Sequence, residues 1–160
     1  MARKRSAASP PGAGVVLGPV TAADYDGLVA LWKASGLTYR PKGRDSRRAI
    51  TRQLRLPTAI YIKALAVEGR RQRLVGAVLG SHDGRRGWIN RLAVLPGYRR
   101  RGVASLLVRA LERRLAALGL LVWAVQVDKG NRGSLGFFRA LGYRLHDDIH
   151  YLSKREGPWS

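Results

Sequence analysis

Cysteine is absent from the 160-residue chain. This absence excludes a disulfide scaffold, a thiolate metal site and a cysteine nucleophile, and it is compatible with a reducing cytoplasm. Long apolar runs are absent too, because none approaches the roughly 20 residues that a membrane-spanning helix needs. No apolar stretch follows the basic first residues, which therefore do not resemble a secretory signal. These absences lead us to expect a cytoplasmic protein without membrane association.

Acidic residues are scarce. Ten Asp and Glu residues stand against 30 Lys and Arg residues, which gives a formal net charge of +20. A surface of that charge attracts phosphates, nucleic acid and other polyanions, and the attraction weakens with salt. A GC-rich coding sequence would also enrich arginine without any partner, so charge alone identifies none. A weak association with polyanions or nucleic acid stays open.

Length and composition fit one packed domain, since 46% of the residues are hydrophobic and 25% are charged. Residues 1–14 mix charge, Ser, Pro and Gly without periodicity, and we expect them to form a flexible basic tail. Residues 15–155 are expected to form a single domain.

Hydrophobic periodicity predicts the order strand, two helices, three strands, helix, strand, helix and a last strand. The strands are expected at residues 15–20, 60–67, 74–79, 88–95, 120–127 and 143–152, and the helices near residues 25–35, 46–56, 102–118 and 131–141. This order predicts an α/β (α+β) fold: a mixed, mostly antiparallel sheet of about six strands with helices on both faces.

The most informative segment is the loop that joins strand 88–95 to the long helix. It contains three successive arginines and then Gly102-Val103-Ala104. The first turn of a helix has amide groups without an intrahelical acceptor, and the helix dipole favours an anion there. Gly102 lacks a Cβ atom, so an oxygen-rich group can approach the backbone. The loop predicts a diphosphate site, although a plain connection with exposed arginines is the alternative. It lacks the Walker and G-x-G-x-x-G patterns.

Arg99-x-x-Gly102-x-Ala104 has the form R/Q-x-x-G-x-G/A and resembles the acetyl-CoA motif of the GNAT superfamily of N-acetyltransferases. The likeness extends over about residues 15–152, and small bacterial and archaeal members look most similar. It is carried further by Ile89–Val94 with Pro96, by Asn131-x-x-Ser134-x-x-Phe137-Phe138 with Gly142-Tyr143, and by Leu31-Trp32, Gly36-Leu37 and Arg40-Pro41. The resemblance implies the GNAT fold and an acyltransferase that moves acetyl from acetyl-CoA directly to a primary amine: a protein N-terminus, a lysine or a small amine.

The resemblance also implies a cofactor site. The pyrophosphate of acetyl-CoA would lie on the amides of residues 101–104, and the pantetheine arm would pair with residues 92–94 like an extra strand. Asn131 would touch the arm and Phe138 would flank the sulfur. The implied cofactor-binding residues are Leu92, Ala93, Val94, Arg99, Arg100, Arg101, Gly102, Val103, Ala104, Asn131 and Phe138. No metal is expected, and a homodimer stays open.

Two departures from the family pattern leave the catalytic acid and base unassigned. Many members carry Tyr where this chain has Phe138 and Glu where it has Asn90, and neither Phe nor Asn can supply the corresponding proton transfer. The weak candidates are Asn90, Tyr143 and Tyr151. His146, Asp147, Asp148 and His150 alternate between strand faces and are not expected to bind a metal.

Two alternatives to an enzyme stay open: a non-catalytic module that binds acetyl-CoA or CoA, and a ribosome-associated or nucleic-acid-associated basic protein. One further segment bears on partners. Residues 40–55 carry seven positive side chains and the single acid Asp45. In the GNAT fold this segment would border the acceptor opening, so it predicts a preference for acidic acceptors.

Overall fold

The computed structural model describes residues 14–157, and a five-stranded sheet with the order β1-β2-β3-β4-β5 lies at its centre. The first four strands pair in antiparallel fashion with their neighbours, and β5 pairs in parallel with β4. The strands are β1 (Val15–Pro19), β2 (Ala59–Glu68), β3 (Arg71–His82), β4 (Gly87–Val94) and β5 (Trp123–Val125). The expected mixed, mostly antiparallel sheet is confirmed. The expected tail lies outside the described residues except for Gly14.

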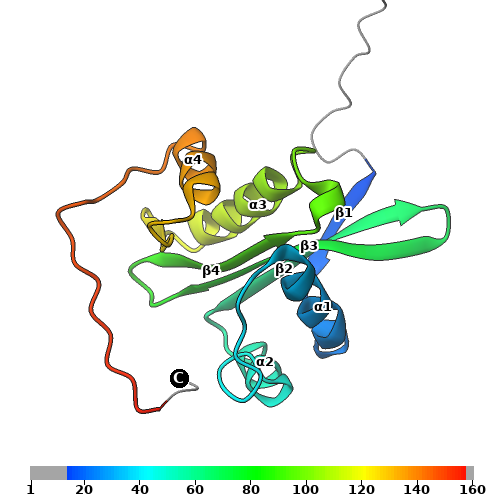
Figure 1. Cartoon of the computed structure of the whole chain (residues 1–160), viewed down its shortest axis with the longest axis horizontal. Coiled ribbons are helices and arrows are strands. Elements are labelled where there is room, and N and C mark those ends of the chain that lie inside the picture. The colour runs from blue at the N-terminus through cyan, green and yellow to red at the C-terminus, as the bar shows by residue number, and fades with distance from the viewer. Residues whose placement is uncertain (1–13, 158–160) are drawn as a thin grey trace, which may run out of the picture.

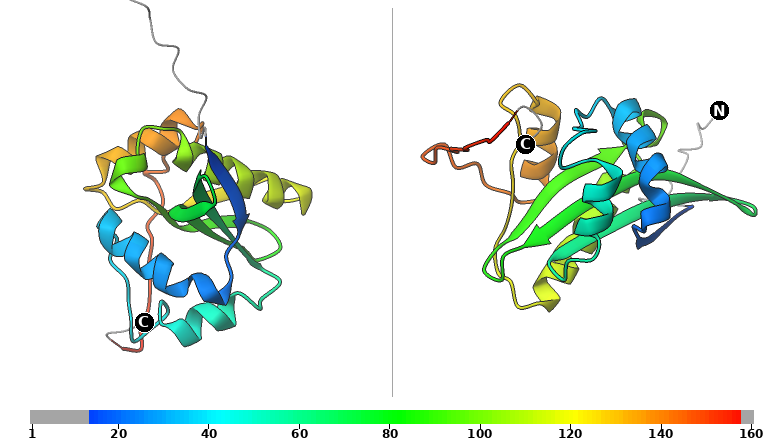
Figure 2. Two further views of the ribbon diagram at one scale, coloured as in Figure 1. Left: turned by 90° about the vertical axis from the view of Figure 1, so that its right-hand side faces the viewer. Right: turned by 90° about the horizontal axis from the view of Figure 1, so that it is seen from below.

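Helices cover both faces of the sheet, as predicted (Figures 1 and 2). The helices α1 and α2 pack on one face, where Leu28, Trp32 and Ile50 form a buried cluster with Ala93 of β4. The helices α3 and α4 pack on the other face. Their bounds are α1 (Tyr25–Ser35), α2 (Arg47–Gln53), α3 (Val103–Ala117) and α4 (Arg132–Ala140), with short 3₁₀ helices η1 (Ala22–Asp24) and η2 (Pro96–Tyr98). No helix in this part of the chain has the length and apolarity that a membrane span requires.

The expected last strand at residues 143–152 is wrong. In the described residues after α4 no helix or strand forms, and every residue from 144 to 157 is exposed (Figure 1). A strand needs a neighbour for its backbone groups, and the only nearby edge strand, β5, spans three residues instead of the predicted eight. An imperfect alternation of apolar residues is present, but the sheet offers this segment no partner strand, so the sheet has five strands and not about six.

A β-bulge divides β4. Leu79 of β3 lies opposite Arg91 and Gly80 lies opposite Ile89, so Asn90 is an extra residue without a partner on β3. The extra residue changes which side chains share a face. Ile89 packs in the cluster on the α3 side together with Leu92 and Val94. Arg91 and Ala93 face α1 instead, where Ala93 is buried and Arg91 stacks on Trp32.

Close packing fixes α3 on the sheet. A Cβ atom added to Gly76, Gly80 or Gly87 would lie within 3.0, 2.5 and 2.6 Å of side-chain atoms of α3. The residues they would meet are Leu107, Leu111 and Leu115, which are four apart and therefore lie along one face of the helix. The absence of side chains at these three glycines thus lets α3 approach the sheet closely and places the N-terminus of α3 beside the end of β4.

Candidate active site

The outer edge of β4 is open next to the loop that precedes α3. β5 pairs only with Gly87–Ile89, so within the described residues no strand covers positions 90–94 on that side. The Leu95 amide donates to the carbonyl of Val75 on β3 at 2.8 Å. Because backbone groups alternate sides along a strand, the amides of Leu92 and Val94 point to the open edge.

Arg99 is folded back onto α1 and β4. Its Nε donates to the Val94 carbonyl at 3.3 Å and its Nη2 to the Ser35 carbonyl at 3.1 Å. The Ser35 hydroxyl also donates to the Val94 carbonyl, at 3.2 Å. Arg99 therefore joins the end of α1, the end of β4 and the start of the basic loop, and it fixes one wall of the open edge.

The loop has an unusual backbone. Arg100 is the only non-glycine residue between 14 and 157 with a positive φ, 61°, and Gly102 has a φ of 79°. Gly102 is the N-cap of α3 and supplies no side-chain oxygen, so this N-terminus has no side-chain cap. By contrast, Ser46 caps α2 and Asn131 caps α4. The first-turn amides of α3, on Val103 and Ala104, are therefore available to a ligand.

Asn131 and Phe138 have structural partners. The Asn131 Oδ1 accepts a hydrogen bond from the Ser134 amide at 3.0 Å, which caps α4. Phe138 is 5% exposed and packs edge-on against Phe137 and Tyr143, with ring centroids 5.0 and 5.1 Å away. Their expected contacts with a cofactor stay predictions.

The three weak catalytic candidates lie in different surroundings. Asn90 sits at the bulge, and its Nδ2 donates to the Ser81 hydroxyl at 2.8 Å. The Tyr143 hydroxyl donates to Glu112 of α3 at 2.8 Å, and burial together with that contact raises the pKa of Tyr143 above its usual value. Tyr151 is 71% exposed on the extended C-terminal segment. A tyrosine whose proton is held by Glu112 is a poor proton donor elsewhere.

The residues between His146 and His150 do not form a metal site. His146 Nδ1 lies 3.9 Å from Asp148 Oδ1, and both side chains are more than 60% exposed. Nowhere in residues 14–157 do three or more His, Cys, Asp or Glu side chains gather closely enough to hold a metal ion.

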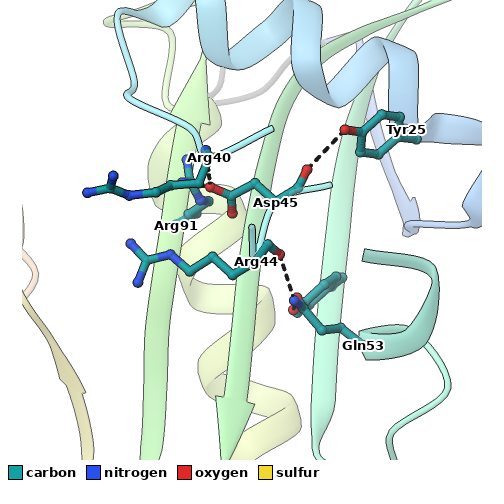
Figure 3. A network of polar contacts seen from close by, with 7 residues as sticks. Tyr25, Arg40, Arg44, Asp45, Gln53 and Arg91 are labelled. Atoms are coloured by element: carbon teal, nitrogen blue, oxygen red, sulfur yellow. Dashed lines mark hydrogen bonds and ion pairs between the residues drawn. The ribbon is translucent and has the colours of Figure 1, made fainter. Parts of the chain in front are cut away.

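Sequence reasoning missed the role of Asp45. It is the only charged or polar residue in the described part of the chain that is buried, at 3% exposure. Its Oδ2 accepts hydrogen bonds from Arg91 Nη2 at 2.6 Å and from the Arg40 amide at 2.7 Å, and its carbonyl accepts one from the Tyr25 hydroxyl at 3.0 Å (Figure 3). The available signal was its position as the single acid among seven basic residues. Ser46, and not Asp45, caps α2.

Polar contacts continue from Asp45 to β2. The Tyr61 hydroxyl donates to Gln53 Oε1 at 2.6 Å, and Gln53 Nε2 donates to the Arg44 carbonyl at 2.8 Å. Burial, helped by the charge of Asp45, raises the pKa of Tyr61 to about 12. Burial also lowers the pKa of the Arg91 guanidinium, and the charge of Asp45 opposes that effect. The loop between α1 and α2 is thus attached to both β4 and β2.

Comparison with known proteins agrees with the observed fold. The family model described as "Acetyltransferase (GNAT) family" matches residues 28–143. Among solved structures, PaiA N-acetyltransferase from Thermoplasma acidophilum in complex with coenzyme A has a TM-score of 0.72 at 14% identity, covering 83% of this chain and 91% of that one. Aminoglycoside 6'-N-acetyltransferase AAC(6')-Ih from Acinetobacter baumannii has a TM-score of 0.71 at 18% identity, covering 90% and 100%. Ard1 from Thermoplasma volcanium has a TM-score of 0.70 at 18% identity, covering 83% and 84%.

Proposed function

Because the chain belongs to the GNAT family of acetyltransferases, we propose that it transfers the acetyl group of acetyl-CoA directly to a primary amine. The observation that carries the proposal is the open edge of β4 beside an α3 N-terminus capped by glycine. One surface there offers amides to an extended amide-containing chain, and the other offers amides to a diphosphate. Acetyl-CoA contains both groups in that order.

Cofactor binding follows from these two surfaces. The pantetheine arm lies along residues 92–94 and pairs with the outward amides of Leu92 and Val94. The pyrophosphate lies on the amides of residues 101–104, where the helix dipole favours its charge. Arg100 and Arg101 add positive charge, and Arg99 holds the loop against α1 and β4. Asn131 and Phe138 complete the site from α4.

The chemistry needs few protein groups. The lone pair of the amine attacks the thioester carbonyl, the C–N bond forms, and an outward amide of β4 stabilises the oxyanion. The C–S bond then breaks and CoA leaves as a thiolate. A thiolate whose conjugate acid has a pKa near 8.5, by analogy with cysteine, can leave without a proton donor, and the proton of the amine passes to water. Phe138 and Asn90 are compatible with this route.

The acceptor is proposed to be acidic. Arg47, Arg48, Thr51, Arg52 and Arg55 line an open hollow on α2. Arg47 is paired with Asp26. Arg48 and Arg52 are exposed and lie one turn apart on one face of α2, and Arg55, also exposed, follows the end of α2. A carboxylate or phosphate near the acceptor amine would bind there. Each of the three acceptor types can have a carboxylate or phosphate close to its amine: a protein N-terminus, a lysine or a small amine.

The test incubates the protein with acetyl-CoA and a panel of amines and follows free thiol. The panel contains a peptide with a free N-terminus, a lysine peptide and kanamycin, each of the peptides with and without flanking Asp residues. Amine-dependent thiol release supports the proposal. Tight CoA binding in calorimetry without release would support a binding module instead. Salt-sensitive retention of RNA without CoA affinity would support a nucleic-acid-associated protein.

A further inference from the structure

The ion pair between Asp45 and Arg91 connects the segment between α1 and α2 to strand β4. Asp45 is the next-to-last residue of the segment 36–46 between α1 and α2, whereas Arg91 lies on β4 beside residues 92–94. The two side chains are 4% and 12% exposed and their closest atoms are 2.6 Å apart. Figure 3 shows the segment crossing over β4 at this point.

Each partner of the pair is held from a second side. Asp45 also accepts from the Arg40 amide, so the carboxylate closes residues 40–45 into a compact turn. The turn has its own backbone bonds, from the Gly43 and Asp45 amides to the Arg40 carbonyl. The Arg91 guanidinium lies 4.7 Å from the centre of the Trp32 ring. The geometry therefore specifies one position for the segment relative to β4.

Stability alone does not explain such a pair. Removing two charges from water is costly, and well-packed apolar residues of similar volume are often as stabilising as a buried ion pair. A hydrogen-bonded pair differs from apolar packing because it allows a single geometry. The pair is therefore suited to fixing a position.

We propose that the Asp45–Arg91 pair is a positioning device that holds residues 36–46 over β4 and so sets the acceptor side of the active site. The inference rests on the proposed function. Arg91 projects to the α1 face of β4, while the basic loop and the start of α3 lie beyond the end of that strand. Loss of the pair should therefore affect acceptor binding much more than acetyl-CoA binding.

The experiment compares two variants of the full-length protein, Asp45→Asn and Asp24→Asn. Asp24 accepts from Lys63 at 2.7 Å with side chains 19% and 16% exposed, so it is a matched ion pair outside residues 36–46. For Asp45→Asn we expect the KM of the acceptor found in the amine panel to rise about tenfold, with the acetyl-CoA Kd changed by less than about twofold. Asp24→Asn should lower thermal stability and leave both constants unchanged.

Two further measurements separate positioning from general stability. Amide hydrogen exchange at Arg40 should become faster in Asp45→Asn and stay unchanged in Asp24→Asn, because only the first substitution removes the negative charge of the group that accepts this hydrogen bond. Asp45→Glu keeps the charge and should restore most of the acceptor KM. If Asp45→Asn does not fold, Arg91→Lys, which keeps the charge but loses the planar fork, is measured in the same way.

An unchanged acceptor KM in Asp45→Asn would overturn the proposal, and so would unchanged exchange at Arg40. If the wild-type protein acetylates no amine in the panel, the proposed function fails. The exchange measurement then still decides whether the pair anchors the segment.

Discussion

Gly102 and Gly119 stand at the two ends of α3 with nearly the same backbone conformation, φ 79° and 78°. Only the first lies beside the proposed diphosphate. A side chain at either position is strained, because L-residues rarely adopt these angles. Comparing substitutions at these two glycines therefore separates the effect of backbone strain from the effect on ligand binding.

We predict that Gly102→Asp weakens acetyl-CoA binding by about 3 kcal/mol, roughly 150-fold in Kd, because the carboxylate would occupy and repel the phosphate position. Gly119→Asp should cost similar stability and leave the Kd unchanged. Calorimetric titration with acetyl-CoA checks both. Equal Kd values for Gly102→Asp and the wild type would remove the loop from the cofactor site.

Tyr61 gives the network around Asp45 a pH dependence. Unfolded Tyr61 loses its proton near pH 10, whereas the folded group keeps it to about pH 12. The folded state binds more protons in this interval, so the free energy of unfolding falls as pH rises from about 10 to about 12, by roughly 2 kcal/mol. Below about pH 10 this contribution is fully present.

We predict that Tyr61→Phe removes this part of the alkaline loss of stability. Urea unfolding of both proteins at about pH 9 and about pH 11.5 measures it. Tyr143, whose pKa is also raised, contributes equally to both proteins and cancels in the difference. Parallel losses in the two proteins would show that Tyr61 titrates normally.

At the level of residues, the sequence predicted the features that depend on neighbours in the chain. The basic loop and Gly102 are local signals, because a glycine before a helix and the helix dipole act within one turn. The Asp45–Arg91 pair joins positions 46 residues apart. Its partner is decided only when the segment and β4 meet, so the sequence showed an isolated acid and nothing more.

Among the elements, α3 depends on the three glycines beneath it. We predict that Gly80→Ala destabilises the protein by about 1–3 kcal/mol, because its Cβ would lie 2.5 Å from a methyl carbon of the fully buried Leu111. Gly136→Ala is the control. Gly136 lies within α4, where an added Cβ would meet nothing within 4 Å, so alanine there should stabilise by about 0.5–1 kcal/mol.

Urea unfolding of the two variants checks the prediction. The double variant Gly80→Ala with Leu111→Ala should show a loss smaller than the sum of the single losses, since the new methyl group fills part of the space that Leu111 leaves. Additive losses would mean that α3 does not rest on Gly80.

Periodicity predicted every helix and the first five strands, because each has an apolar face that the sheet buries. It failed for residues 143–152, where Leu145, Ile149, Tyr151 and Leu152 alternate imperfectly and remain more than half exposed. A helix satisfies its own backbone, but a strand does so only with a partner. Whether an amphipathic segment becomes a strand is therefore decided by the length of the adjacent edge, which the segment itself does not encode.

For the whole molecule, ion pairing removes positive and negative charges one for one and leaves the excess of 20 positive charges unchanged. Three of the ten acids are paired with basic residues: Asp24 with Lys63, Asp26 with Arg47 and Asp45 with Arg91. In the segment that carries seven positive side chains, the only acid is buried. The net field on this side of the molecule is therefore positive.

We predict that the KM of an acceptor peptide with flanking Asp residues rises steeply between about 50 and 200 mM salt, while that of a neutral peptide stays nearly constant. A triple Ala variant of Arg48, Arg52 and Arg55 should remove the salt dependence. A triple Ala variant on α3 is the control and should keep the salt dependence; it replaces Arg109, Arg113 and Arg114. A flat KM for the acidic peptide would make the positive charge of α2 a consequence of composition.

Because of the bulge at Asn90, the number of residues in β4 decides which side chains share a face of the sheet. Gly87 and Ile89 share a face with Leu92 and Val94 only because Asn90 is an extra, unpaired residue between them. Deleting Asn90 would remove the bulge and leave these side chains on their present faces. A single deletion among residues 91–94 would instead either turn that end of the strand over or, if the bulge were lost, place the guanidinium of Arg91 on the apolar α3 side. Relatives of this chain should therefore gain and lose residues freely in the hairpin at residues 83–86 and can lose the extra residue at position 90, while single insertions or deletions elsewhere in β4 should be eliminated by selection.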